Sequence, residues 1–338
     1  MTAQAFATLT QGRIRPETLD KIGSEVALVE EELARRLGNS DVALVKRVGG
    51  LTLQAGGKRL RPAFVALAAQ ATGLPFDPAR TRKLGAGLEM IHMATLIHDD
   101  VIDHAATRRG KPTAAAEVGN TASILSGDVL LARAMALLAE DGDLDLIRTV
   151  SAAVVDMAEG EVREVEVRGD FNLSIEDHFD VLQRKTASFI EACCEGGALV
   201  AKASKPVCEA LRLYGHHVGL AFQIVDDLLD YRGDREKTGK PIATDFREGQ
   251  ATLPLILLRP KLSAAEAQNV RTKFGGGVSD DELRMFADWM HTRGAFDEAE
   301  AMAHRHIEQA LDALRALPPS PARDLLETVA EYVVRREA

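Results

Sequence analysis

The chain has 338 residues, of which 46% are hydrophobic, 4% are aromatic and 27% are charged, and its formal net charge at pH 7 is −10. A chain of this length and apolar content can bury a large core, and its scarcity of aromatic residues favours helices over sheet. The negative charge argues against nucleic acid or an anionic membrane surface as a partner.

We expect neither a secretory signal nor a membrane span. The N-terminal stretch MTAQAFATLTQGRIRPE lacks the basic-then-apolar order of a signal peptide. No stretch of about 18 residues is free of charged and turn residues. The cysteines form no even disulfide framework and are typical of core residues in a reduced protein: Cys193, Cys194 and Cys208. The sequence therefore predicts a cytoplasmic protein with no transmembrane segment.

Apolar residues recur at helical spacing almost throughout the chain. In the segment 19–37, for example, Ile22, Val26, Val29 and Leu33 share one face. Further helices are predicted over 41–55, from about 62, and over 78–104, 120–140, 144–167, 174–202, 206–232, 280–293 and 299–317. Strand patterns are weak, and no linker rich in Ser, Gly or Pro divides the chain. We expect one all-α domain over residues 1–338, with its most apolar helices at the centre of a bundle.

Three aspartates close the helix predicted over 78–104, in the stretch LIHDDVIDHAATRRG: Asp99, Asp100 and Asp103. A helix C-terminus carries partial negative charge, so each acid there is disfavoured by about 0.3–1 kcal/mol. Residues three and four apart lie on one face of a helix, so these carboxylates repel one another. At about 4 Å and an effective dielectric of about 20, one such pair costs about 4 kcal/mol.

The same unfavourable arrangement occurs again in QIVDDLLDYRGD, where Asp226, Asp227 and Asp230 follow an apolar run. Clustered carboxylates without thiolates suit a hard divalent cation such as Mg²⁺, which usually takes further ligands from water and substrate phosphates. The simpler alternative is a pair of solvated helix ends rich in aspartate. Because each trio ends an apolar helix, we favour magnesium binding.

Cations suited to phosphate accompany these acids. The stretch GGKRLRP places Lys58, Arg59 and Arg61 after a Gly-Gly turn and at a predicted helix start, where backbone N–H groups favour an anion. Four more cations and one histidine are candidates: Arg108, Arg109, Lys185, Lys240 and His92. Each of these alone is more typical of a solvated charge or a core histidine, so only their combination points to a phosphate site.

The ordered set GGKRLRP, HDDVIDHAATRRG, KT, QIVDDLLD and GKPIATDFREGQATLP resembles the trans-polyprenyl diphosphate synthases. The resemblance spans about Gly56 to Pro254. It implies an all-α, isoprenoid synthase-like fold, an antiparallel helical bundle around a central cavity, and a homodimer. It also implies a prenyltransferase that condenses isopentenyl diphosphate with an allylic diphosphate such as farnesyl diphosphate, with about three Mg²⁺ ions per active site.

The resemblance assigns roles to single residues. The two trios would hold the Mg²⁺ ions: Asp99, Asp100, Asp103, Asp226, Asp227 and Asp230. Five residues would bind isopentenyl diphosphate: Gly57, Lys58, Arg61, His92 and Arg109. The allylic substrate would contact a second set: Arg108, Lys185, Thr186, Gln223 and Lys240. Two positions depart from the family pattern, since Gln250 stands where a lysine is common and Glu164 stands where a glutamine is usual.

The product length would depend on residues just before the first acid. In the family, the residues four and five positions before it form a floor, and here they are the small Thr95 and Ala94. Met135 on a neighbouring helix is a candidate for a deeper stop. This pattern resembles the octaprenyl, solanesyl and decaprenyl enzymes, whose products become quinone side chains, ubiquinone among them. The alternatives are that Ala94 simply packs against another helix, and that the product is shorter, farnesyl or geranylgeranyl diphosphate.

Other functions explain less of the sequence. A metal phosphohydrolase using His92, His98 and Asp99 would leave the second trio and GGKRLRP unused. A terpene cyclase usually carries Asn, Ser or Thr with Glu in its second metal motif. A non-catalytic partner subunit would lack acids that are all present here. A di-iron bundle needs two ExxH pairs, and only the pair Glu89 and His92 fits that spacing.

Overall fold

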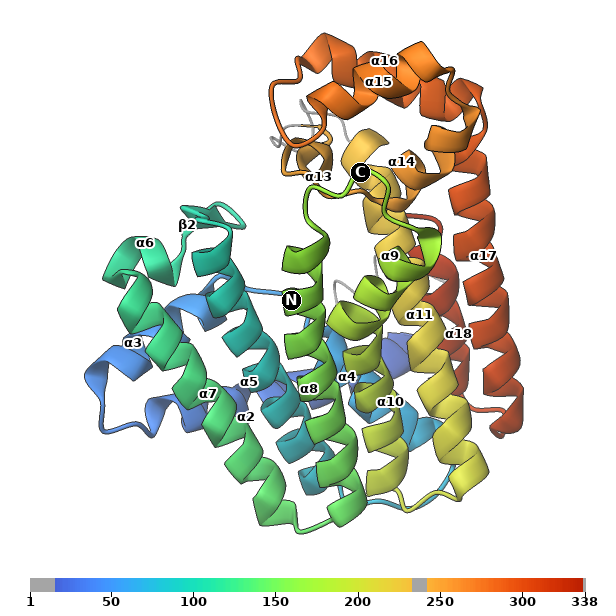
Figure 1. Cartoon of the computed structure of the whole chain (residues 1–338). Helices are drawn as coiled ribbons and strands as arrows, with labels where there is room; N and C mark the ends of the chain where they lie inside the picture. Colours follow the sequence, from blue (N-terminus) through green and yellow to red (C-terminus); the bar gives the residue numbers. More distant parts are fainter. Residues whose placement is uncertain (1–15, 233–241, 337–338) are drawn as a thin grey trace. The chain divides into compact units, whose positions relative to one another are not determined.

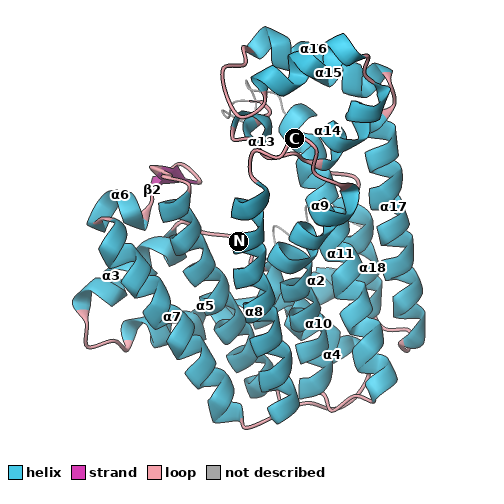
Figure 2. Ribbon diagram, viewed as in Figure 1, coloured by secondary structure: helices cyan, strands magenta, loops and turns pink. Residues whose placement is uncertain are grey.

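The computed structural model describes residues 16–232 and 242–336, and over these residues the predicted all-α class is confirmed (Figure 1). Figure 2 shows helices throughout, with strands confined to one short hairpin in the described part of the chain. The elements up to the middle of the chain are α2 Pro16–Gly38, α3 Ala43–Gln54, α4 Leu60–Ala71, α5 Pro78–Ile102, β1 Thr107–Arg108, β2 Lys111–Pro112, α6 Ala114–Val118, α7 Asn120–Asp141 and α8 Leu144–Val167. The remaining elements are α9 Ile175–Leu182, the π-helix η1 Gln183–Ala187, α10 Ser188–Val200, α11 Lys205–Arg232, α13 Thr244–Arg247, α14 Leu253–Leu258, η2 Arg259–Lys261, α15 Ala264–Lys273, α16 Asp280–Thr292, α17 Ala295–Ala313, η3 Leu314–Ala316 and α18 Pro321–Val333.

Contacts along the chain divide it into two compact units. Unit 1 lies within Met1–Ser151, Ala192–Leu211 and Ala316–Thr328, and unit 2 lies within Ala152–Glu191, Arg212–Arg315 and Val329–Ala338. The expectation of a single domain over residues 1–338 stays a prediction.

Helix α5 is the centre of unit 1, where it packs against α7, α4 and α2. Asp77 caps its start by accepting a hydrogen bond from the backbone N–H of Ala79 at 2.9 Å, and Pro78 occupies the first helical position, where a missing N–H costs nothing. Leu88 and Ile91 are fully buried on it. This confirms the prediction that the helix ending in the first aspartates is a core helix.

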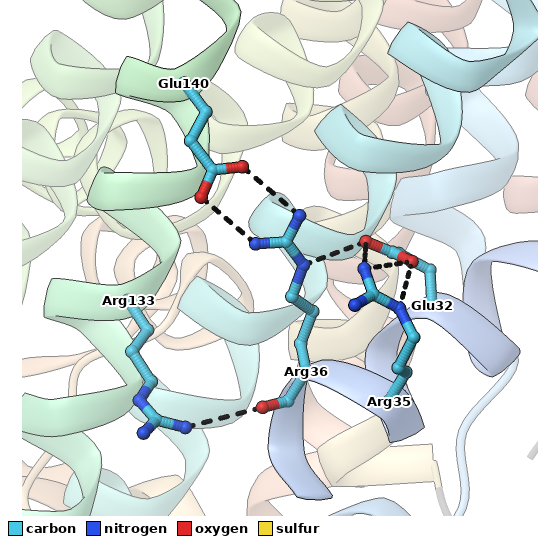
Figure 3. Close-up of polar contacts among 5 residues, drawn as sticks. All are labelled: Glu32, Arg35, Arg36, Arg133 and Glu140. Atoms are coloured by element: carbon cyan, nitrogen blue, oxygen red, sulfur yellow. Dashed lines mark hydrogen bonds and ion pairs between the residues drawn. The ribbon is translucent and has the colours of Figure 1, made fainter. Parts of the chain in front are cut away.

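Charged side chains join α2 to α7 at the surface of unit 1 (Figure 3). Arg36 lies between two carboxylates, bonding Glu32 on its own helix at 2.9 Å and Glu140 of α7 at 3.2 Å. Arg133 of α7 donates to the backbone carbonyl of Arg36 at 3.4 Å. Single surface pairs contribute at most about 1 kcal/mol, so this network orients α2 and α7 more than it stabilises them.

Helix α7 is long and apolar enough, by length and composition alone, to cross a membrane, and 39% of its most apolar window is buried. It carries Asp128 and Arg133, and it packs against α5 in unit 1. Packed helices of water-soluble proteins pass the same test of length and composition.

Unit 2 has its own core. The short apolar helix α14 packs against α9, α16 and α17. Beside it, Phe246 meets Phe274 and Phe286 at ring-centroid distances of 5.4 and 5.6 Å. Edge and tilted ring contacts of this kind add about 0.5–1.5 kcal/mol each to the burial of the rings. They fix α13, α15 and α16 on one another.

One predicted helix is divided in the structure. The sequence predicts a continuous helix over 174–202, whereas α9 gives way to the π-helix η1 at Gln183, and α10 begins only at Ser188. The π turn packs closely against Gly160 of α8, where a Cβ would lie 2.7 Å from the backbone N of Lys185. A Cβ at Gly219 of α11 would lie 2.7 Å from the Cα of Ala187. The wide turn is therefore packed between two glycines.

Candidate active site

The first aspartate trio lies at the end of α5 in unit 1. Asp100 is buried, with 5% of its surface exposed, and accepts a hydrogen bond from Nε of Arg108 at 2.8 Å. Asp99 is half-buried, and Asp103 is exposed as the residue that follows the helix. Arg108 stands on β1, the first strand of the hairpin that follows α5, and from there it pairs with Asp100. The arginine offsets part of the repulsion predicted for these carboxylates.

Unit 1 also contains a cluster of arginine side chains near the turn at Gly56 and Gly57. Arg59 is buried and bonds Glu89 and Glu30, each at 2.9 Å. Arg109 donates to the backbone carbonyl of Gly56. A Cβ at Gly57 would lie 2.9 Å from a terminal nitrogen of Arg109 and 3.0 Å from one of Arg59. Glycine at position 57 therefore allows two arginines to approach the turn.

His92 lies among these arginines. Burial lowers the pKa of His92 well below its usual value, and the positive charges of Arg61, Arg109, Arg108 and Arg59 lower it further. The imidazole is thus neutral at pH 7. Burial also lowers the pKa of Arg61 and of Arg109. The positive charge around this neutral ring favours the binding of an anion. A guanidinium group can form two parallel hydrogen bonds to the oxygens of a phosphate.

The structure thus brings together four of the five residues predicted to bind isopentenyl diphosphate: Gly57, Arg61, His92 and Arg109. The fifth, Lys58, follows Gly57 and is exposed. Arg108, predicted to bind the allylic substrate, contributes to the same positive potential at His92.

The second aspartate trio lines a cavity of about 840 Å³ in unit 2. Asp227 is buried at 6% exposure, and its Oδ2 meets Nε2 of His178 at 2.8 Å and the backbone N–H of Leu253 at 3.1 Å. Asp226 forms an ion pair with Arg336 at 2.9 Å. Asp230 accepts hydrogen bonds from the backbone N–H groups of Thr244 and Asp245 at 3.0 and 3.2 Å.

Asp245 adds a fourth aspartate to this cavity. Burial, followed by the charges of Asp230 and Asp227, raises the pKa of Asp245 far above its usual value. Burial likewise raises the pKa of Asp230, against the two backbone hydrogen bonds that lower it. A cation bound beside Asp230 and Asp245 would favour the ionised forms of both carboxyl groups.

This donor set fits a hard divalent ion, because it offers several carboxylate oxygens and no thiolate. Within residues 16–232 and 242–336, no group of three His, Cys, Asp or Glu side chains is gathered closely enough to hold an ion without other ligands. Mg²⁺ usually binds through one or two carboxylates and takes its other ligands from water and phosphate. The residues therefore fit magnesium together with a phosphorylated substrate.

Lys185 lies on the wall of the same cavity, on the π-helix, with its ammonium group 2.7 Å from Glu164 and 3.1 Å from Glu161. Burial alone would lower the pKa of Lys185, but Glu164 and Glu161 outweigh it and raise the pKa above its usual value. Gln223 and Gln250 also line the cavity. Thr186 is half-buried beside Lys185 on η1, and Lys240 lies outside the described residues.

Comparison with known proteins decides the family. The sequence matches the family described as polyprenyl synthetase over residues 42–285. The octaprenyl diphosphate synthase of Escherichia coli K12 is 36% identical over 318 residues, which cover 94% of this chain and 96% of that protein. The chain belongs to the polyprenyl synthetase family.

Solved polyprenyl synthetases share the fold. A decaprenyl diphosphate synthase from Rhodobacter capsulatus superposes with a TM-score of 0.89 at 33% identity, covering 95% of this chain and 99% of that one. A polyprenyl synthase from Caulobacter crescentus, complexed with calcium and isoprenyl diphosphate, gives a TM-score of 0.86 at 36% identity, covering 95% and 97%. The predicted isoprenoid synthase-like fold and the predicted enzyme class, a trans-prenyltransferase, are confirmed.

Three polar residues of this polyprenyl synthetase were not among the predicted site residues. Asp245 stands in the stretch GKPIATDFREGQ, so its acid could have been included with the trio that precedes it. His178 and Arg336 carried no signal in the sequence, because each is a single residue that stands outside the motifs. Only folding brings His178 to Asp227 and Arg336 to Asp226.

The residues predicted to limit product length lie in unit 1 of the polyprenyl synthetase. Ala94 is buried at 2% exposure on α5. Thr95 beside it is half-buried, and its hydroxyl donates to the backbone carbonyl of His92 at 2.9 Å. Met135 is half-buried on α7. Their effect on chain length stays a prediction.

Proposed function

We propose that this polyprenyl synthetase is magnesium-dependent and joins isopentenyl diphosphate repeatedly to an allylic diphosphate, with farnesyl diphosphate or a similar ester as primer. The products would be long all-trans polyprenyl diphosphates, as needed for quinone side chains. The observation that carries this proposal is the unit 2 cavity, where Asp226, Asp227 and Asp230 lie with Lys185. Acids and a cation in one cavity suit a metal-bound diphosphate.

Bound Mg²⁺ would supply positive charge to the diphosphate as it leaves, which favours breaking the allylic C–O bond. Lys185 and Arg108 would hold oxygens of this leaving group, and Lys240 would join them. Thr186 and Gln223 would face the allylic carbons and favour their positive charge through their oxygen atoms. Charge that develops in the transition state is then stabilised more strongly than the intact ester.

Isopentenyl diphosphate would bind the guanidinium cluster of unit 1. Arg61 and Arg109 would hold its phosphate oxygens, with Lys58 at the exposed edge and the neutral ring of His92 as a hydrogen-bond donor. Its double bond would attack the allylic cation and form the new C–C bond. A proton is then lost to the released diphosphate, which leaves an allylic ester five carbons longer.

The small side chains of Ala94 and Thr95 support a long product, because neither would block a growing tail beside α5. Met135 would set a more distant limit. A shorter product, farnesyl or geranylgeranyl diphosphate, is the competing outcome.

We further propose a homodimer that works in the cytoplasm. Val155, Val162 and Val165 of α8 are 55%, 61% and 57% exposed and share one face of the helix. A second copy of the chain would cover them, since exposed apolar faces often mark interfaces. Sedimentation should give a dimer for the wild type and a monomer for Val162→Glu, while Leu74→Glu, at another exposed apolar position, should stay dimeric.

The function is tested by incubating the purified chain with labelled isopentenyl diphosphate, farnesyl diphosphate and Mg²⁺, and sizing the products. We expect diphosphate release that needs both substrates and a ladder of products well beyond geranylgeranyl length. Products that stop at that length would support the short-chain alternative. Phosphate released from one substrate alone would indicate a phosphohydrolase.

A further inference from the structure

Lys185 of η1 is held by two carboxylates of α8. Its ammonium group lies 2.7 Å from Glu164 and 3.1 Å from Glu161. The two acids are three residues apart on α8, so they lie on one face of that helix. The two backbones approach closely here, since a Cβ at Gly160 of α8 would lie 2.7 Å from the backbone N of Lys185. The lysine and both acids therefore form one fixed ion-pair group.

Only one of these acids also lines the cavity. Glu164 belongs to the cavity wall together with Lys185 and the second aspartate trio. Its negative charge contributes to raising the pKa of Asp245 across the cavity. Glu164 is 18% exposed in its side chain, so solvent screens it only partly. A diphosphate entering this cavity would find the ammonium group of Lys185 already paired with the carboxylate of Glu164.

We propose that Glu164 is a positioning residue that holds Lys185 when the cavity is empty and weakens the binding of the allylic diphosphate. The role rests on the proposed function, in which Lys185 binds that diphosphate. Two effects act in the same direction. Glu164 competes with phosphate oxygens for the lysine protons, and its charge repels the incoming anion.

The decisive variant is Glu164→Gln, which keeps the shape and one acceptor but removes the charge. We expect the Kd of inorganic pyrophosphate, measured by calorimetry with Mg²⁺ present, to fall about three- to tenfold. The KM of the allylic diphosphate should fall by a similar factor, and the KM of isopentenyl diphosphate should not change. Glu164→Asp, which keeps the charge, should behave like the wild type.

Glu166→Gln is the matched control. It makes the same change of charge on the same helix, but Glu166 is 60% exposed in its side chain and pairs with Arg163. It should leave pyrophosphate affinity unchanged. In a Lys185→Ala background, the gain from Glu164→Gln should shrink, because the competition for the lysine is gone.

An unchanged or weaker pyrophosphate affinity in Glu164→Gln would overturn this role, as would an equal gain in Glu166→Gln. The proposed function fails separately, if the wild type forms no prenyl product from the two diphosphates. A purely structural role for Glu164 would lower the melting temperature of Glu164→Gln without the selective change in allylic KM, and this result would also overturn the proposal.

Discussion

Ala94 lies on α5, five residues before Asp99, which places it about 7.5 Å along the helix from the first acid. It is 2% exposed and small, so a larger side chain would have to take space from its neighbours or from a bound tail. Its size therefore has a direct chemical consequence if the product grows along this helix.

We predict that Ala94→Phe shortens the products by several isoprene units, because the ring fills the path of the tail. Overpacking costs about 1–3 kcal/mol, so the variant should be checked for folding by circular dichroism. Ala94→Leu should give products of intermediate length. The length distribution is read by mass spectrometry, and a distribution equal to that of the wild type would refute the floor assignment.

Among the elements, the π-helix η1 departs most from the sequence prediction, which gave one continuous helix over 174–202. A π turn inserts a wider loop into a helix and is frequent at functional sites. Here it presents Lys185 to the cavity, and it fits only because Gly160 and Gly219 leave room for its backbone. The position of Lys185, which we propose binds diphosphate, thus depends on two glycines of neighbouring helices.

We expect Gly160→Ala to destabilise the fold by about 1–3 kcal/mol, because the added methyl group would meet the backbone of Lys185. Gly50→Ala is the control, since nothing lies within 4 Å of a Cβ there and α3 should gain about 0.5–1 kcal/mol. Urea denaturation measures both. Equal stability of the two variants would show that the close packing of η1 is unimportant.

Helices α15 and α16 each begin with a capping box, formed by Ser263 with Glu266 and by Ser279 with Glu282. Arg293 and Ser263 lower the pKa of Glu266 to about 2, and Ser279 and Lys273 lower the pKa of Glu282 to about 2. Both values lie below those of an unfolded chain, so this stabilisation is complete above about pH 4.5 and is lost as the pH falls toward 2.

The urea midpoint of the wild type should therefore decrease as the pH falls from about 4.5 toward 2. The decrease should be smaller in the double variant Glu266→Gln, Glu282→Gln, because neither glutamine titrates. Parallel pH curves for the two proteins would contradict the assignment. The side chains of both glutamates are 28% exposed, so salt should reduce the difference.

For the whole molecule, helix positions could be predicted because their cause is local. Apolar spacing and the caps at Asp77 and Gly142 fix the ends of α5 and α7 to within a few residues of the prediction. The π turn could not be predicted, since its cause is packing against glycines distant in sequence. The acid trios and the cations near them were visible as motifs, whereas His178 and Arg336 join the site only after folding.

The central claim is that both aspartate trios serve one magnesium-dependent condensation. It is tested by measuring the incorporation of isopentenyl diphosphate by two single variants, Asp100→Asn and Asp227→Asn, after their folding has been verified. We predict that each variant alone loses about a thousandfold or more in rate, because each trio would hold Mg²⁺, whose positive charge would stabilise the departing diphosphate. If either variant kept a rate within about tenfold of the wild type, that trio would not take part in the reaction, and the proposed function would be wrong.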